Sequence, residues 1–467
     1  MKNSFFNKTV SRRSFLQDCG KMTSIGALSS IISLKMVNQV FAARPSGSIT
    51  DYKGLVCIFF HGGNDSFNML TPGLGSAWDN YVATRGNLAL PQAEMHRIVD
   101  SVSGQDYHVH RRMEGVKNLF DDGDLSFVAN VGTLVEPTTL SQMQNSSVKL
   151  PYGLYSHNDQ QKQWQTSISD TRSGSVTGWG GRMLEILNDA ANNNATAAVN
   201  LSPSGSNLFQ DSGSSIPFSI KGGVNSLDLY KSNSSIKDAV DSDLEKAYST
   251  VLQNHHEHVR ARSIEQTELL ETIADNTDIA TPFPNTYLGK QLRQVAIYIK
   301  AQGVDGLNAN RQTFFCSQGG FDLHGEGLDA HNNLLQSVSD ALVAFNAALK
   351  EIGYHDKVVT YTASDFGRSL TTNGGGTDHG WGGNQIVMGG PVSGGQVFGD
   401  YPTLALGTMT DTGRGRQLPT TSVDELHASL AYWYGIENNN EMELVVPNIR
   451  NFWTSGSTQT PIAGMFG

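Results

Sequence analysis

The chain has 467 residues, which suffices for one large α/β domain or two domains of average size. Its mean hydropathy of -0.30 is typical of a soluble protein, and no apolar run after the N-terminal region is long enough to span a bilayer. The formal net charge of -11 argues against nucleic acid as a partner, because binding to phosphates requires a basic face.

The N-terminal segment has the features of an export signal. Residues 11–16 read S-R-R-S-F-L, the pattern of a twin-arginine signal, and a weakly hydrophobic stretch follows. Residues 40–42 then offer a cleavage site of the small-x-small type. We therefore expect a signal peptide at 1–43, passage through the twin-arginine export machinery, and a mature domain at 44–467 that is periplasmic or secreted. The alternative is an ordinary amphipathic N-terminal helix.

Four short apolar runs predict buried strands, and each is followed by a polar, glycine-rich loop. Because these runs are continuous rather than alternating, they indicate a sheet that is covered on both faces. Amphipathic segments between and after them predict helices, and this order favours an α/β fold with a mostly parallel sheet. The predicted strands span 55–60, 125–131, 312–316 and 357–363, and the predicted helices span 286–301, 332–352 and 423–434.

Segments near 138–150 and 190–280 are rich in polar residues and predict surface insertions within one domain. The second segment contains His255, His256 and His258, for which a solvated helix face is favoured over a metal-binding tract. Beyond the predicted signal the chain has two cysteines, Cys57 and Cys316, each in an apolar run. Two buried thiols are expected, with a disulfide as the alternative if their strands are neighbours.

Carboxylates and imidazoles recur in the loops that follow the predicted strands. In a parallel sheet these loops meet at the carboxyl edge, where like charges would repel unless divalent cations neutralised them. A single D-x-H pair is more often a hydrogen-bonded turn than a ligand set, but four such loops favour a metal site. The residues are His61, Asp65 and Ser66 in the first loop, Ser156 and His157 in the second, Asp322 and His324 in the third, and Asp365, Arg368, Asp378 and His379 in the fourth.

The fourth loop, residues 364–384, reads SDFGRSLTTNGGGTDHGWGGN and is almost free of large side chains. We expect SDFGR and TDHGWGG to form two rims of one pocket for a metal and an anion, joined by the glycine-rich crossing, where large side chains would block the turn. The alternative is a surface loop in which Asp378 bonds to its own backbone.

The ordered motifs G-G-N-D-S-F-N, S-H-N-D-Q-Q-K-Q-W, G-G-F-D-L-H, S-D-F-G-R and T-D-H-G-W-G-G resemble the bacterial family called domain of unknown function 1501. That family is in turn similar to the alkaline phosphatase and sulfatase superfamily. The resemblance implies a three-layer alkaline phosphatase-like fold with divalent metals at the carboxyl edge of the sheet. It assigns metal ligation to Asp65, Asp322, His324, Asp365, Asp378 and His379, with Leu323 in place of the usual Thr and Asp365 in place of the usual Glu.

The expected activity is hydrolysis of a small anionic phosphate or sulfate ester by an exported enzyme that uses zinc, manganese, magnesium or calcium. Arg368 is expected at an anionic oxygen, and His157 as a ligand or a hydrogen-bonded support. The nucleophile is not obvious: Ser156 and Ser66 are the candidates, and no C-x-P-x-R motif of a conventional sulfatase is present. The alternative is a non-catalytic exported binding or assembly protein that retains the fold. An oxidoreductase is disfavoured because no G-x-G-x-x-G follows the first strand.

Replacing Arg12 and Arg13 with Lys should leave the protein in the cytoplasm with its N-terminus intact, because the twin-arginine route reads this pair. Fractionation and N-terminal sequencing of both forms measure this, and wild type should begin near Ala43. Undiminished export of the double variant would contradict the prediction.

Overall fold

The centre of the sheet consists of three strands that the sequence predicts. In the computed structural model, β1 (Lys53–Phe60) lies between β8 (Arg311–Gln318) and β9 (Val358–Ser364) and pairs with both in parallel. All of β9 and all of β1 after Lys53 are buried. Such continuous burial is expected of central strands whose two faces are both covered, and it explains their unbroken apolar sequences.

The structure describes residues 49–170, 177–192, 200–212, 218–220, 228–244, 246, 251–303, 307, 309–325, 327–453 and 460–467. The signal peptide predicted at 1–43 lies outside these residues. Residues Ser46–Gly467 form one compact unit. Within the described residues, no helix combines the length and the apolar character that crossing a membrane requires.

The large sheet has the strand order β13-β5-β12-β9-β1-β8-β6-β7, and β14 also pairs with β5. Strand β12 is antiparallel to both of its neighbours, while the other pairs are parallel. The mostly parallel sheet predicted from the sequence is therefore confirmed. The remaining strands are β5 (Leu125–Gly132), β6 (Asn200–Ser202), β7 (Phe218–Ser219), β12 (Gly383–Met388), β13 (Val397–Phe398) and β14 (Thr421–Ser422).

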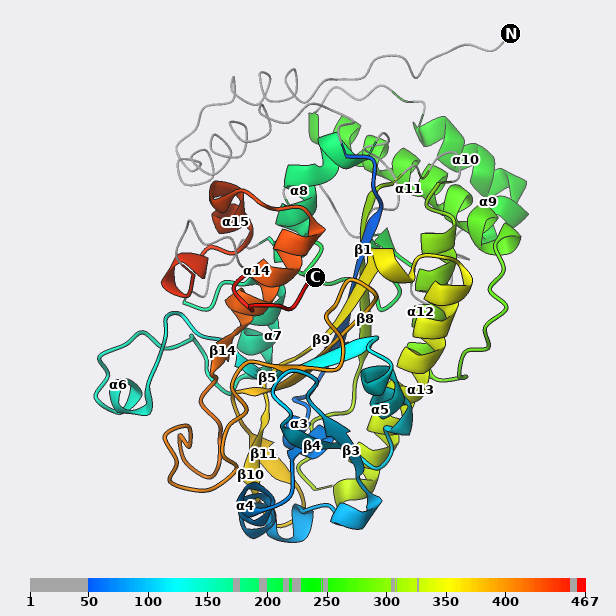
Figure 1. Cartoon of the computed structure of the whole chain (residues 1–467). Helices are drawn as coiled ribbons and strands as arrows, with labels where there is room; N and C mark the ends of the chain where they lie inside the picture. The colour runs from blue at the N-terminus through cyan, green and yellow to red at the C-terminus, as the bar shows by residue number, and fades with distance from the viewer. Residues whose placement is uncertain are drawn as a thin grey trace. The chain divides into compact units, whose positions relative to one another are not determined.

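Helices cover both faces of this sheet, as Figure 1 shows. On one face, Leu292 and Leu342 from two long helices pack with Val56 and Ile58 of β1 in the main apolar core. On the other face, the ring of Trp179 lies 5.9 Å from that of Tyr361 in β9. The first face carries α5 (Glu114–Asp121), α12 (Tyr287–Lys300) and α13 (Gly327–Glu351); the second carries α7 (His157–Thr166), α8 (Trp179–Ala191) and α14 (Val423–Tyr434).

The smaller elements surround this three-layer core. Helices α6 (Leu140–Gln144) and α10 (Ser234–Leu244) bury none of their described residues, as expected of surface segments. His256 is exposed and pairs with Glu257, which is consistent with a solvated helix face. The other helices are α3 (Ser66–Met69), α4 (Ser76–Arg85), α9 (Asp228–Ser232), α11 (Val251–Asn276) and α15 (Asn439–Val445). A three-stranded sheet consists of β2 (Leu70–Pro72), β3 (His96–Val99) and β4 (Asp106–Val109). A hairpin consists of β10 (Arg368–Thr372) and β11 (Thr377–His379).

Cys57 and Cys316 are buried free thiols on the adjacent strands β1 and β8. Cys57 is paired in register with Phe315, whereas Cys316 is paired with Ile58. This offset of one residue directs the two side chains to opposite faces of the sheet, because side chains alternate along a strand. Burial raises the pKa of Cys57 to about 12 and also raises the pKa of Cys316, so both favour the thiol form.

We therefore predict that the protein without residues 1–43 shows no reactive thiol while folded and two after denaturation. Titration with a thiol reagent, with and without guanidinium chloride, measures both numbers; a Cys57→Ala variant should show one thiol after denaturation. Rapid labelling of the native protein, or no labelling of the unfolded and unreduced protein, would contradict this arrangement.

Candidate metal centre

Three strand ends lie side by side at the carboxyl edge of the sheet. Phe60 of β1 is in register with Gln318 of β8 and with Ser364 of β9, so the loops that follow them begin at the same level. Gly62 in the first loop has φ +115°, and a Cβ there would lie 2.3 Å from the backbone nitrogen of Asp322. Only glycine permits this approach, which brings the Asp322 loop against the first loop.

The glycine-rich stretch forms a β-hairpin that returns His379 to the same edge. Strands β10 and β11 are antiparallel, and Arg368 is paired in register with His379. The connecting turn has Gly374 at φ +114°, and a Cβ on Gly376 would lie 2.4 Å from the carbonyl oxygen of Leu323. The turn therefore requires small residues where it packs against the backbone of the neighbouring loop, which explains why the stretch is so bare.

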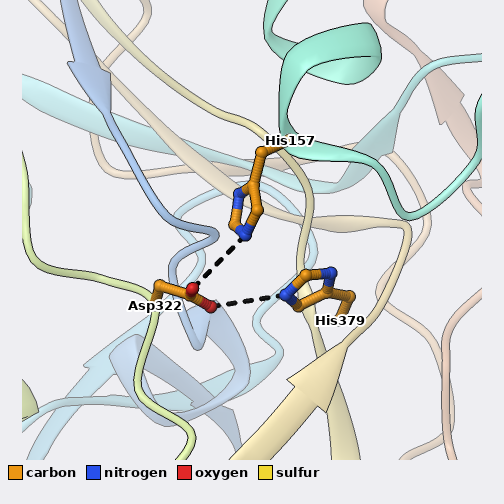
Figure 2. Close-up of side chains that lie close together, drawn as sticks. All are labelled: His157, Asp322 and His379. Atoms are coloured by element: carbon orange, nitrogen blue, oxygen red, sulfur yellow. Dashed lines mark ion pairs between the residues drawn. The ribbon is translucent and has the colours of Figure 1, made fainter.

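Three histidines converge on the carboxylate of Asp322. Figure 2 shows His157 and His379 pointing at it from two sides, with Nε2–oxygen distances of 3.4 and 3.3 Å. Ligand atoms of these three residues all lie within 4.8 Å of one another. His324 joins them, since its Nε2 is 2.9 Å from Asp322 Oδ1 and 3.1 Å from His379 Nε2. The side chains of Asp322 and His324 are both 45% exposed, so solvent reaches the cluster.

The other ring nitrogen of each histidine faces an oxygen atom. An Nδ1–H that donates to oxygen fixes the orientation of the ring and leaves Nε2 with a free lone pair, as is typical of histidines that bind metals. Two of these contacts are hydrogen bonds: His157 Nδ1 with Asp365 Oδ2 at 2.6 Å, and His379 Nδ1 with the carbonyl oxygen of Tyr155 at 2.8 Å. His324 Nδ1 lies 3.6 Å from Asp378 Oδ1, which is too far for a hydrogen bond.

The spacing of these atoms fits a divalent cation. Ligands at 2.0–2.1 Å from a tetrahedral zinc ion are separated from one another by about 3.4 Å. The four distances that join Asp322 to the three histidines and His324 to His379 run from 2.9 to 3.4 Å. His157, Asp322 and His379 are therefore close enough together to hold a cation, with His324 beside them. Imidazole ligands favour zinc or another transition metal over magnesium or calcium.

Charges around the cluster shift the protonation of its members. Burial alone would raise the pKa of Asp322, but the hydrogen bond and charge of Arg368, followed by the two nearby imidazoles, lower it. The pKa of His157 is raised, chiefly by its hydrogen bond to Asp365 and against burial. The pKa of His379 is lowered, because burial and the charge of Arg368 outweigh the hydrogen bond to the Tyr155 carbonyl. Asp322 is thus ionised and His379 is neutral near neutral pH.

Two predicted site residues lie behind the histidine cluster. Asp365 was expected to bind the metal, and Arg368 was expected to bind the substrate. Asp365 is fully buried, and besides His157 its Oδ2 accepts hydrogen bonds from the Gln161 amide and the Gly62 nitrogen. The fully buried guanidinium of Arg368 donates to Asp322 at 2.8 Å and to both the carbonyl and the hydroxyl of Thr377. In this structure Asp365 orients a histidine, and Arg368 holds Asp322 rather than facing solvent.

Asp65, Ser66 and Ser156 are not part of the cluster. Asp65 is buried and forms an ion pair with Arg85 of α4. Ser66 is also buried, and its hydroxyl accepts a hydrogen bond from the Asn384 nitrogen at 2.7 Å. Ser156 caps the N-terminus of α7, where its hydroxyl accepts from the backbone of the first turn and thereby places the adjacent His157 at the start of the helix.

Four residues that contact the cluster or the groups around it were not predicted from the sequence: Tyr155, Gln161, Arg414 and Arg416. Tyr155 and Arg414 have φ values of 70° and 60°, a left-handed conformation that is costly for residues other than glycine and that clusters at functional sites. Arg414 pairs with Asp378, and Arg416 Nε donates to the carbonyl oxygen of His379 at 2.9 Å. The sequence Gly-Arg-Gly-Arg at 413–416 places two cations among glycines, but it gives no sign of what the arginines contact.

The family model described as "Protein of unknown function (DUF1501)" matches residues 52–446. The chain belongs to this family. The resemblance that the ordered motifs carry is therefore confirmed, and the matched residues include every residue of the histidine cluster. No protein with a curated description matches the sequence.

Several solved structures are similar to the chain at low identity. The soluble domain of lipooligosaccharide phosphoethanolamine transferase A from Neisseria meningitidis is 9% identical to this chain, with a TM-score of 0.37. The match covers 87% of this chain and 96% of that domain. The PsFucS1 sulfatase from Pseudoalteromonas sp. is 10% identical, and the match covers 94% of this chain and 76% of the sulfatase with a TM-score of 0.34. The periplasmic domain of EcEptC from Escherichia coli, in complex with zinc, is 8% identical, with coverages of 84% and 84% and a TM-score of 0.33. With TM-scores below 0.5, no feature of these proteins is transferred to this chain.

We predict that Asp365→Asn weakens binding of a divalent cation by about 10- to 100-fold, the usual effect of losing the group that orients a metal-binding histidine. His379→Ala, which removes a ligand atom, should weaken it further. Zinc titration of the metal-stripped protein measures both affinities, and Asp340→Asn on the exposed surface of α13 is the matched control. Wild-type affinity in both site variants would contradict the assignment.

Proposed function

We propose that this protein is an exported hydrolase that cleaves a phosphate or sulfate ester with the help of a divalent cation held by Asp322, His157, His324 and His379. The observation that carries the proposal is the convergence of three Nε2 atoms on one carboxylate while each Nδ1 faces an oxygen. Neither a hydrogen-bonded turn nor a solvated surface requires three oriented imidazoles at one point.

The ligand atoms favour some of the four candidate metals (zinc, manganese, magnesium and calcium) over the others. Imidazole nitrogens suit zinc and manganese better than magnesium or calcium, which prefer oxygen ligands. When bound, such a cation polarises an ester oxygen and lowers the pKa of a water molecule beside it. We therefore favour zinc, with manganese as the second choice.

The residues of the chain prepare the site for this chemistry. Asp365 and the Tyr155 carbonyl orient His157 and His379 so that their Nε2 atoms face Asp322, and the hydrogen bond and charge of Arg368 lower the pKa of Asp322. The hydroxyls of both candidate nucleophiles accept backbone hydrogen bonds, and that of Ser66 is buried away from solvent. We therefore propose that water rather than a serine attacks the ester.

Zinc- or manganese-loaded protein should hydrolyse p-nitrophenyl phosphate, bis(p-nitrophenyl) phosphate or p-nitrophenyl sulfate, as measured by release of p-nitrophenol. Asp322→Asn and His379→Ala should lower the rate by about 100-fold or more, because each removes a proposed ligand. Asp340→Asn should behave as wild type.

The same assay separates the hydrolase from its alternative. Stoichiometric binding of the cation without hydrolysis of any of the three esters would favour a non-catalytic binding or assembly protein. Absence of both cation binding and hydrolysis would refute the proposed function.

A further inference from the structure

The loop formed by residues 411–417 lies beside the histidine cluster in a fixed conformation. The carboxylate of Asp411 accepts hydrogen bonds from the backbone nitrogens of Gly413 and Gly415, each at 2.8 Å. The backbone of the loop also accepts a hydrogen bond from Leu370 of β10 at 3.2 Å. The loop is therefore tied to the hairpin that carries His379.

Two arginines project from this loop toward the groups that hold the histidines. Arg414 forms an ion pair with Asp378, the carboxylate that faces His324 Nδ1. Arg416 donates its Nε–H to the carbonyl oxygen of His379, and its guanidinium lies 5.0 Å from the centre of the Tyr155 ring. The carbonyl of that same tyrosine accepts the hydrogen bond from His379 Nδ1.

The two arginines differ in whether their guanidinium groups are already engaged in an ion pair. The charge of Arg414 is offset by Asp378. Among the described residues, Arg416 forms no ion pair, and its side chain makes one hydrogen bond, through Nε. Both of its Nη groups therefore remain available while the ring of Tyr155 and the carbonyl of His379 fix the plane of the guanidinium. A planar, oriented guanidinium fork binds the oxygens of phosphate or sulfate groups well.

We infer that Arg416 is the residue that binds the anionic head of the substrate. This inference rests on the proposed function, because the ester would be cleaved at the histidine cluster beside this arginine. It extends that function by assigning the recognition of the ester oxygens to a residue outside the metal-binding set.

The test uses methyl phosphate and methyl sulfate, which have nearly the same shape and differ in charge at pH 8. Their binding to the zinc-loaded full chain is measured by calorimetry for wild type, Arg416→Gln and Arg416→Lys, after the zinc content of each has been determined. Arg450→Gln removes an exposed arginine that pairs with Glu443 and is the matched control. Thermal unfolding of each variant shows whether it is folded.

Zinc-loaded wild type should bind both methyl phosphate and methyl sulfate. Arg416→Gln should weaken binding of methyl phosphate by about tenfold or more at unchanged zinc content, since hydrogen bonds to charged groups are worth this much. Arg416→Lys should fall between the two, because lysine keeps the charge and loses the fork. Arg450→Gln should match wild type.

Wild-type affinity of folded, zinc-loaded Arg416→Gln for methyl phosphate would overturn the inference. If such a protein still hydrolyses esters, only the inference fails and the proposed function stands. If wild type takes up no zinc and binds neither probe, the proposed function and the inference both fail.

Discussion

The ionised carboxylate of Asp322 is the group on which the rest of the site depends. Its two oxygens lie 2.8–3.4 Å from Arg368 and from the Nε2 atoms of three histidines. Without that negative charge, a buried guanidinium and three imidazoles would face one another unshielded, and no cation could be held among them. The close approach at Gly62, where a Cβ would lie 2.3 Å from the Asp322 nitrogen, fixes this carboxylate relative to the central strand.

Each member of the cluster is held by a group further from solvent. Asp365, fully buried at the end of β9, accepts hydrogen bonds from the first loop and from two residues of α7. Arg368 is fully buried beneath Asp322. Burying charges is costly unless they are paired and hydrogen-bonded; here Arg368 pairs with Asp322, and Oδ2 of Asp365 accepts three hydrogen bonds, while its Oδ1 has no partner. Folding therefore preorganises the ligands, so a cation would bind without ordering them first.

The sequence predicted the central strands, and the carboxyl edge of the sheet as the location of the site, better than it predicted the roles of individual side chains. Continuous apolar runs identified β1, β5, β8 and β9 because central parallel strands are buried on both faces. Asp322, His324 and His379 followed from their positions after those strands. The position of Asp365 behind His157, and that of Arg368 beneath Asp322, could not be predicted, because they depend on side-chain direction across segments 208 and 46 residues apart. Tyr155 and Arg416 were missed because their roles arise from a backbone carbonyl and a ring face, which leave no motif.

The most direct test of the account is the position of the cation itself. A crystal structure of the zinc-loaded protein, with anomalous diffraction measured on both sides of the zinc absorption edge, locates the ion without any assumption about its ligands. The arrangement of the cluster predicts one strong peak within about 2.0–2.2 Å of an Asp322 oxygen and of the Nε2 atoms of the surrounding histidines. A fully loaded crystal with its zinc peak elsewhere, or with the three histidine rings turned so that Nδ1 faces the peak, would contradict it.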